Sequence, residues 1–137
     1  MRSPSTLVSI SDLRGDTEEK VRRTLLIVDD EEGPRQSLRV VFKEEYNLLL
    51  ASNGPDAVEL AKNNRINAAV LDIRMTGMSG TELLRQARAL RPALRVILIS
   101  GMGAVKVDPI LGNVTVLQKP LRAEEFLRRV KEALPEE

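Results

Sequence analysis

The sequence predicts an α/β fold, in which a doubly wound sheet of five parallel strands carries helices on both of its faces. Five short apolar segments alternate with amphipathic segments along the chain. The apolar residues run continuously instead of alternating with polar ones, as is typical of strands that are covered on both faces. At 137 residues the chain has the length of one domain, and no internal repeat competes with this interpretation.

Strands and helices are predicted in turn along the chain. The predicted strands comprise residues 24–28, 47–51, 68–71, 95–100 and 114–117. The predicted helices comprise residues 35–44, 55–63, 81–90 and 123–134, where apolar side chains recur at helical spacing. Asn53 caps the second helix, with Pro55 in its first turn, and Ser79 and Glu82 form a capping box at the start of the third.

Three segments lack this regular pattern. We expect residues 1–22, which are rich in polar side chains, to form a flexible tail with at most a short helix near residues 16–21. Residues 23–134 then form the folded domain, and residues 135–137 form a second tail. Residues 101–113 contain Pro109 and three glycines, which predicts a loop with a short turn, so that the fourth helix of the fold is short or irregular.

The composition excludes several classes of function. The chain has neither cysteine nor histidine, which excludes disulfides, cysteine nucleophiles, thiolate and imidazole metal sites and a histidine general base. The net charge of +1 argues against a surface that is basic throughout. The chain has only three aromatic residues, Phe42, Tyr46 and Phe126, so few side chains could stack on nucleic-acid bases. No apolar run is long enough to cross a membrane, and residues 1–16 do not resemble a secretory signal, so we expect a cytoplasmic protein.

Polar residues stand at the carboxyl ends of four predicted strands. They are Asp29 and Asp30 after the first, Asp72 after the third, Ser100 at the end of the fourth and Lys119 after the fifth. Taken singly, each is more often a helix cap, a turn residue or a solvated loop side chain. Because ligands of a doubly wound sheet collect beyond the carboxyl ends of its strands, the combination predicts a functional site at this edge.

The chemistry of this set favours phosphoryl transfer. Clustered carboxylates repel one another unless a cation lies between them, and without histidine or cysteine the suitable cation is a hard divalent ion such as Mg²⁺. Lys119 would supply positive charge and Ser100 a hydroxyl donor to phosphoryl oxygens, while the central Asp72 would attack phosphorus. The glycine-rich motifs of nucleotide-binding proteins and the calcium-binding loop motif are absent from the sequence.

Around these residues the chain resembles the receiver domains of bacterial two-component response regulators. The motifs that carry the resemblance are LLIVDDE at 25–31, VLDIRM at 70–75, GMSG at 77–80, ILIS at 97–100 and LQKP at 117–120. The similarity extends from about residue 23 to residue 134, nearly the whole of the predicted domain. It implies the flavodoxin-like strand order 2-1-3-4-5.

The resemblance also implies roles for individual residues. Asp72 is the phosphoacceptor, Ser100 is the hydroxyl that turns toward the bound phosphoryl group, and Lys119 is the lysine that contacts it. The family's Mg²⁺ is held by carboxylates and one carbonyl oxygen, which here correspond to Asp29, Asp30, Asp72 and the backbone carbonyl of Arg74.

The implied partner is a phosphohistidine donor, either a sensor histidine kinase or a histidine phosphotransfer protein. The chain is then a signalling phosphoacceptor and not an enzyme that acts on an external substrate. We expect it to control an output partner or domain, as a monomer or as a phosphorylation-dependent homodimer, without binding nucleic acid or membranes itself.

Two other functions remain open at this point. A Mg²⁺-dependent phosphohydrolase would also use Asp72 as its nucleophile, but it needs a second acid–base carboxylate close after it, and Arg74 stands two residues further on. A protein-binding pseudo-receiver would keep the fold without being phosphorylated. Multiple turnover on phosphate esters would indicate the hydrolase, and failure to take up either Mg²⁺ or phosphate would indicate the pseudo-receiver.

Three features depart from the family pattern. Thr76 stands where the family usually has proline, which predicts a more mobile loop after Asp72. Val116 occupies the position of the tyrosine or phenylalanine that rotates on activation, and a valine has no ring to rotate. The stretch from Ser100 to Lys119 is a few residues shorter than is typical, which predicts an altered face where many relatives dimerise.

Overall fold

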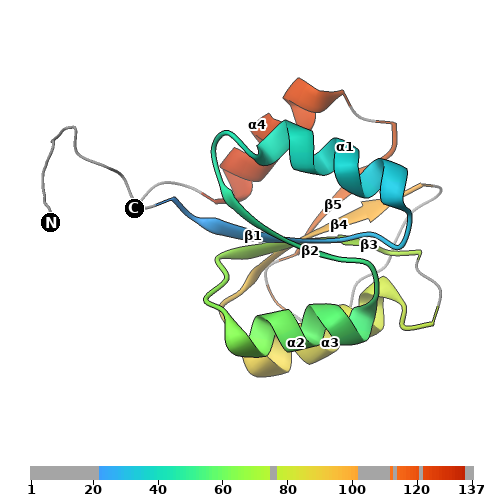
Figure 1. Ribbon diagram of the computed structural model, residues 1–137, viewed down its shortest axis with the longest axis vertical. Coiled ribbons are helices and arrows are strands. Elements are labelled where there is room, and N and C mark those ends of the chain that lie inside the picture. Colours follow the sequence, from blue (N-terminus) through green and yellow to red (C-terminus); the bar gives the residue numbers. More distant parts are fainter. Residues whose placement is uncertain (1–21, 75–76, 102–111, 113, 121, 135–137) are drawn as a thin grey trace, which may run out of the picture.

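The computed structural model describes residues 22–74, 77–101, 112, 114–120 and 122–134, which form a parallel sheet between two layers of helices (Figure 1). The strands are β1 (Thr24–Val28), β2 (Asn47–Ala51), β3 (Ala68–Asp72), β4 (Arg95–Ser100) and β5 (Val114–Gln118). The helices in this part of the chain are α1 (Glu32–Phe42), α2 (Gly54–Asn63), α3 (Gly80–Leu90) and α4 (Ala123–Ala133). The predictions for Thr76, for the two tails apart from residue 22 and for the loop before β5 apart from residues 101 and 112 fall on residues outside these ranges.

The strand order is β2-β1-β3-β4-β5 and every neighbouring pair is parallel, which confirms the predicted strand order and fold class. The register places Asp72 beside Ile99 and Ser100 beside Gln118. Because all five strands run in the same direction, their carboxyl ends meet at one edge of the sheet, which is the edge where the sequence places the candidate site.

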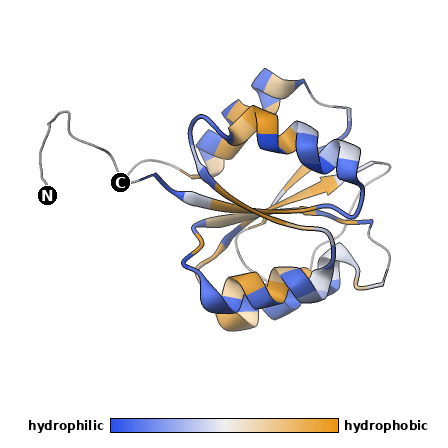
Figure 2. Cartoon of the chain, in the orientation of Figure 1, coloured by the Kyte–Doolittle hydropathy of each residue, from blue (hydrophilic) through white to orange (hydrophobic). Residues whose placement is uncertain are grey.

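Helices cover both faces of the sheet. Side chains alternate along β1, so that Leu25 and Ile27 pack on the side of α1 and α4 whereas Leu26 and Val28 pack on the side of α2 and α3. The helices turn apolar faces toward the sheet and polar faces outward (Figure 2). Burial on both faces explains why the strands read as continuous apolar runs. In the described ranges, no helix has the length and apolar character needed to cross a membrane.

The aromatic residues join α1 to α4. The ring of Phe42 lies edge-on to those of Tyr46 and Phe126, with ring centroids 6.0 and 6.3 Å apart. All three residues are buried, with at most 8% of their surface exposed. The aromatic side chains therefore belong to the core, and none of them is placed to stack on a ligand.

Side-chain caps form at α2 and α3 where the sequence predicts them. Asn53 Oδ1 accepts a hydrogen bond from the N–H of Asp56 at 2.8 Å, and Ser79 Oγ accepts one from the N–H of Glu82 at 3.2 Å. The Glu82 carboxylate accepts instead from two side chains of the following turn, so only the hydroxyl half of the predicted capping box forms.

The predicted boundaries of α1 are wrong. The helix comprises Glu32–Phe42, whereas the sequence predicts residues 35–44. Pro34 lies in the first turn, where the N–H that proline lacks would have no partner within the helix, so it does not delay the helix start. Both β3 and β5 extend one residue beyond the prediction, so that Asp72 is itself part of β3.

Candidate functional site

Backbone hydrogen bonds hold the strand ends together at the predicted edge. The N–H of the residue after Asp72 donates to the carbonyl of Ile99 at 3.0 Å, and the N–H of Lys119 donates to the carbonyl of Ser100 at 2.8 Å. Asp29 follows β1 at the same edge, where its N–H donates to a carbonyl at the end of β2 at 3.2 Å. The ends of all five strands, far apart in the sequence, thus meet at this edge of the sheet.

The Asp72 carboxylate lies between a backbone donor and a lysine. Its Oδ1 accepts a hydrogen bond from the N–H of Arg74 at 2.9 Å, and its Oδ2 lies 3.6 Å from Nζ of Lys119. Asp72 is only 8% exposed, whereas the Lys119 side chain is 40% exposed. The backbone therefore fixes one carboxylate oxygen, and the ammonium group stands on the side that is open to solvent.

Asp29 is a buried carboxylate at the start of the turn into α1. Its Oδ1 accepts from the N–H of Glu31 at 3.0 Å, and its carbonyl accepts from Nη1 of Arg35 at 2.8 Å. Burial raises the pKa of Asp29, and the negative charges of Asp72 and Asp30 raise it further, against the hydrogen bond from Glu31 and the positive charge of the lysine. Arg35 was not predicted as a site residue, because the sequence of a helix does not show which carbonyl group an arginine side chain reaches.

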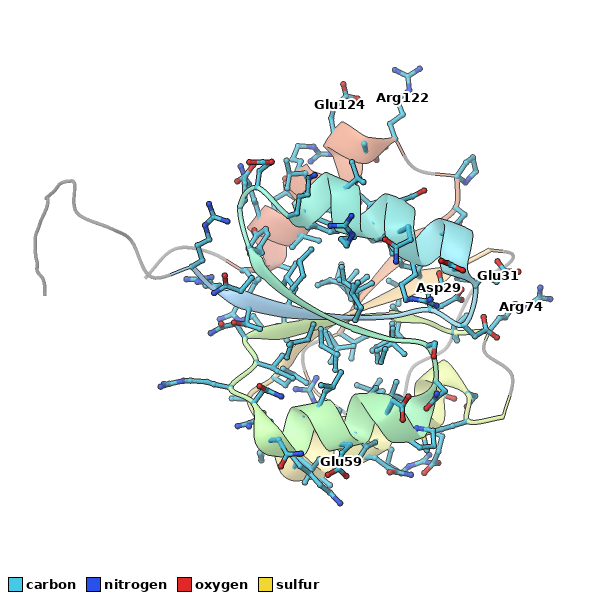
Figure 3. The ribbon with its side chains drawn as sticks, in the orientation of Figure 1. Asp29, Glu31, Glu59, Arg74, Arg122 and Glu124 are labelled. Atoms are coloured by element: carbon cyan, nitrogen blue, oxygen red, sulfur yellow. The ribbon has the colours of Figure 1, made fainter. Side chains whose placement is uncertain are left out.

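An open pocket of about 520 Å³ lies at this edge and is lined by Asp30, Asp72, Arg74, Lys119, Glu31, Ile73 and Gly101. The first four are predicted site residues. Asp29 and Ser100 are each only 2% exposed and lie buried at the same edge instead of lining the pocket. Figure 3 places Asp29 and Glu31 beside the start of α1, with Arg74 projecting from the neighbouring loop. The structure therefore brings all six predicted residues to one edge, four around the pocket and two beneath its surface.

The donor chemistry of this edge suits magnesium. Within the ranges that the structure covers, no group of three or more carboxylates is arranged to hold a metal ion. Mg²⁺ does not need one, because it is commonly bound through one or two carboxylates and keeps several waters. The available donors are carboxylate and carbonyl oxygens. Burial is the main cause of the raised pKa of Asp29, and the charges of Asp72 and Asp30 add a repulsion that a cation would relieve.

Gly80, at the start of α3, packs directly on the backbone that follows the central aspartate. A Cβ atom on Gly80 would lie 2.6 Å from the carbonyl oxygen of Asp72 and 2.6 Å from Cα of Ile73. The N–H of Gly80 also donates to the carbonyl of Ile73 at 3.2 Å. From the sequence, this glycine was assigned to the capping sequence that begins at Ser79 and to the GMSG motif at 77–80, with no predicted contact. Its role depends on a contact across the site that no local pattern reveals.

Comparison with known proteins agrees with this architecture. Residues 25–131 match the family described as response regulator receiver domain. Sporulation initiation phosphotransferase F of Bacillus subtilis is 34% identical over 115 residues, which cover 81% of this chain and 93% of that protein. Response regulator MprA of Mycobacterium sp. (strain KMS) is 34% identical over 114 residues, which cover 80% of this chain but only 50% of that protein. The chain thus spans nearly all of the first relative and about half of the second.

Solved structures share the fold over most of the chain. A CheY-like receiver domain protein from Methanospirillum hungatei JF-1 matches with a TM-score of 0.77 at 28% identity, covering 83% of this chain and 94% of that one. A chain of the CheX–CheY–BeF₃–Mg²⁺ complex from Borrelia burgdorferi matches with a TM-score of 0.77 at 30% identity, covering 89% and 95%. The sequence matches and the shared fold agree, and the chain belongs to the family of response regulator receiver domains of two-component signalling.

Proposed function

We propose that Asp72 accepts a phosphoryl group from the phosphohistidine of a sensor histidine kinase or a histidine phosphotransfer protein, in a reaction that requires Mg²⁺. The observation that carries this proposal is the nearly buried Asp72 carboxylate 3.6 Å from the Lys119 ammonium, at an open pocket. A carboxylate held in this way can act as a nucleophile, and the ammonium offers positive charge to the oxygens of an incoming phosphoryl group.

The chain's own groups position the reaction. The N–H of Arg74 holds Oδ1 of Asp72, which leaves Oδ2 to attack phosphorus. As the new O–P bond forms, the P–N bond of the donor breaks and its electron pair leaves with the imidazole. Lys119 then pairs with one phosphoryl oxygen. The hydroxyl of Ser100, which is buried at the end of β4, donates to another after it turns toward the site.

The same edge would hold the magnesium ion. Asp30, Asp72 and the backbone carbonyl of Arg74 line or border the pocket and would bind it directly, with Asp29 acting partly through water. When bound, Mg²⁺ would neutralise negative charge on the phosphoryl oxygens. The oxygen-only donor set and the burial of Asp29 beside two other carboxylates support this assignment.

Phosphorylation would then act as a signal. It adds nearly two negative charges beside Lys119, and the side chains at the pocket must rearrange to meet them. We propose that this rearrangement controls an output partner or domain, with the chain acting as a monomer or as a phosphorylation-dependent homodimer. Val116 packs with the core on the side of α2 and α3. Because valine has no ring, the conformational change cannot be transmitted by an aromatic side chain that rotates at this position.

Phosphorylation by a small donor tests the proposal. The full chain is incubated with Mg²⁺ and acetyl phosphate, and its intact mass is measured. One phosphoryl adduct is expected on the wild type and none on Asp72→Asn. The variant Asp56→Asn makes the same chemical change at an exposed carboxylate of α2 and should keep the adduct. An adduct on Asp72→Asn, or repeated turnover of p-nitrophenyl phosphate, would overturn the proposal.

A further inference from the structure

A second pocket lies at the opposite edge of the sheet from Asp72. It has a volume of about 700 Å³ and lies where β1, β3 and β4 begin and α4 ends. Four of its lining residues are Arg23, Arg65, Arg91 and Arg95, and none of its lining residues in the described ranges is acidic. We call it the arginine pocket, after these four residues.

The fold holds three of these guanidinium groups in place. Arg23 and Arg95 each donate to a carbonyl oxygen at the end of α4, at 2.9 and 2.8 Å. Arg91 donates to two carbonyl oxygens at the end of α2, at 3.0 and 2.6 Å. A guanidinium carries five N–H donors, so its one bond orients Arg95 without using most of its hydrogen-bonding capacity, whereas Arg91 keeps only Nη1 for a ligand because its Nε is buried. Groups that are already oriented lose less entropy when they bind a ligand.

Three of the four pocket arginines have no carboxylate partner among the described residues. Arg65, Arg91 and Arg95 form no ion pair with any residue that the structure describes. Elsewhere on the surface, arginines do pair within their own helices, for example Arg85 with Glu82 and Arg128 with residues of α4. Among the described lining residues there is therefore an excess of positive charge that the net charge of +1 does not reveal.

The pocket also presents apolar surface. Leu90 lines it and is 41% exposed, one of only two large apolar side chains in the described ranges with so much exposure. A ligand for this surface combines negative charge with an apolar group. Single-stranded nucleic acids are usually held by stacking on aromatic rings, and Phe42, Tyr46 and Phe126 are all buried in the core. Carboxylates match the planar fork of arginine in two-point hydrogen bonds.

We propose that the arginine pocket binds an acidic segment of a partner protein. The carboxylates of that segment pair with Arg65 and Arg95, and an apolar side chain of the segment packs against Leu90. Because the pocket lies at the edge opposite Asp72, a partner held there leaves the phosphorylation site open. This inference goes beyond phosphotransfer and does not depend on it.

Peptide binding to the full chain tests the inference. The probe is the fluorescein-labelled peptide Glu-Glu-Leu-Glu-Glu-Leu-Glu, measured by fluorescence anisotropy at low salt, with a peptide that carries Gln for each Glu as its control. We expect the acidic peptide to bind the wild type and to bind the double variant Arg65→Gln/Arg95→Gln about tenfold more weakly or worse. The double variant Arg39→Gln/Arg122→Gln removes the same charge from exposed positions that do not line the pocket, and should bind like the wild type.

Folding and nucleic-acid binding are checked in the same experiment. Circular dichroism melting shows whether each variant folds. Arg65→Gln alone keeps the test valid if the double variant unfolds, because Arg65 makes no hydrogen bond within the described ranges. Equal loss of binding in both double variants, or no binding by the wild type, would overturn the inference. Tighter, pocket-dependent binding of a labelled oligothymidylate would also overturn it, in favour of a nucleic-acid ligand.

Discussion

Asp29 is the residue at which burial and charge repulsion act on the same carboxylate. It is 2% exposed, and burial together with the charges of Asp72 and Asp30 raises its pKa. The hydrogen bond from Glu31 and the charge of Lys119 offset only part of this effect. When Asp29 is ionised and no cation is bound, its charge therefore lowers the stability of the fold.

Replacing Asp29 by asparagine should stabilise the metal-free protein at neutral pH. Between about pH 4, where an unfolded aspartate titrates, and the higher pKa of the folded state, the folded chain binds more protons than the unfolded chain. The free energy of unfolding of the wild type thus falls as the pH rises through this window. We expect Asp29→Asn to raise that free energy by about 1 kcal/mol at pH 7, with the difference shrinking toward pH 4.

Urea denaturation in EDTA, followed by circular dichroism at several pH values, measures this difference. Glu44→Gln is the control, because it neutralises an exposed carboxylate after the end of α1 and should change the stability little at any pH. If Asp29→Asn instead lowered the stability equally at every pH, the hydrogen bond from Glu31 would outweigh the cost of burying the charge.

At this scale the sequence predicted which residues come to the edge but not how deep they lie. Parallel strands with polar residues at their carboxyl ends are enough to bring Asp72, Ser100 and Lys119 together. Depth depends on how the loops and helices cover each side chain, which a strand pattern does not contain. The burial of Asp29 and Ser100, in contrast to the open position of Lys119, could therefore be learned only from the structure.

At the level of the elements, α3 contacts the site through Gly80. We expect Gly80→Ala to lower the free energy of unfolding by about 2 kcal/mol, because the added Cβ would lie 2.6 Å from the carbonyl oxygen of Asp72 and backbone atoms cannot move aside cheaply. The same displacement should slow phosphorylation by acetyl phosphate, because it shifts the backbone that carries the nucleophile.

Gly33 is the matched control for this substitution. It also lies in the first turn of a helix, α1, but no atom lies within 4 Å of the position its Cβ would occupy. Gly33→Ala should leave the stability unchanged or raise it by up to about 1 kcal/mol, because alanine favours helix. Urea denaturation and the intact-mass assay compare the two variants. Equal effects at both positions would contradict the close contact at Gly80.

The start of α2 depends on a single side-chain cap. Asn53 Oδ1 accepts from the N–H of Asp56 at 2.8 Å, so we expect Asn53→Ala to cost about 1 kcal/mol of stability. Asn63 stands at the last position of the same helix and makes only an exposed side-chain bond to Glu59. Asn63→Ala should change the free energy of unfolding by far less. A cost at Asn63 as large as at Asn53 in urea denaturation would argue against the capping role.

Elements whose ends carry chemical signals were easier to predict than those without them. The N-cap residues of α2 and α3 were predicted correctly because Asn53 and Ser79 each provide a side-chain acceptor. At α1 the N-cap residue Glu31 makes no side-chain cap, and the helix start is set by the turn in which Asp29 accepts from Glu31. That bond depends on the site and not on a helical pattern, so the predicted start at residue 35 was three residues late.

On the scale of the whole molecule, the parallel sheet separates two chemically different edges. The carboxyl edge holds Asp72 and Lys119, and the opposite edge holds the arginine pocket. The sequence predicted the first edge because polar residues interrupt apolar strands at their ends. It could not predict the second, because arginines are common in loops and the four come from three separate segments whose charges cancel in the total.

Magnesium that binds only at the carboxyl edge should raise the free energy of unfolding of the whole domain. A ligand that binds only the folded chain raises the free energy of unfolding by about 1.4 kcal/mol at about ten times its Kd. For a domain of this size we expect the Tm to rise by about 4 °C. Thermal unfolding with and without MgCl₂, followed by circular dichroism, measures the shift. It should shrink as the pH falls toward the raised pKa of Asp29, because protonated carboxylates do not bind Mg²⁺.

Variants at the two edges separate this effect from general salt stabilisation. Asp72→Asn removes a carboxylate from the pocket at the carboxyl edge and should lose most of the Mg²⁺-dependent rise in Tm. Arg65→Gln/Arg95→Gln changes only the arginine pocket and should keep the full rise. A rise that survives in Asp72→Asn would place the ion elsewhere. If both variants lost the Mg²⁺-dependent rise in Tm, the two edges would not act independently, because a substitution at either edge would then alter the magnesium site.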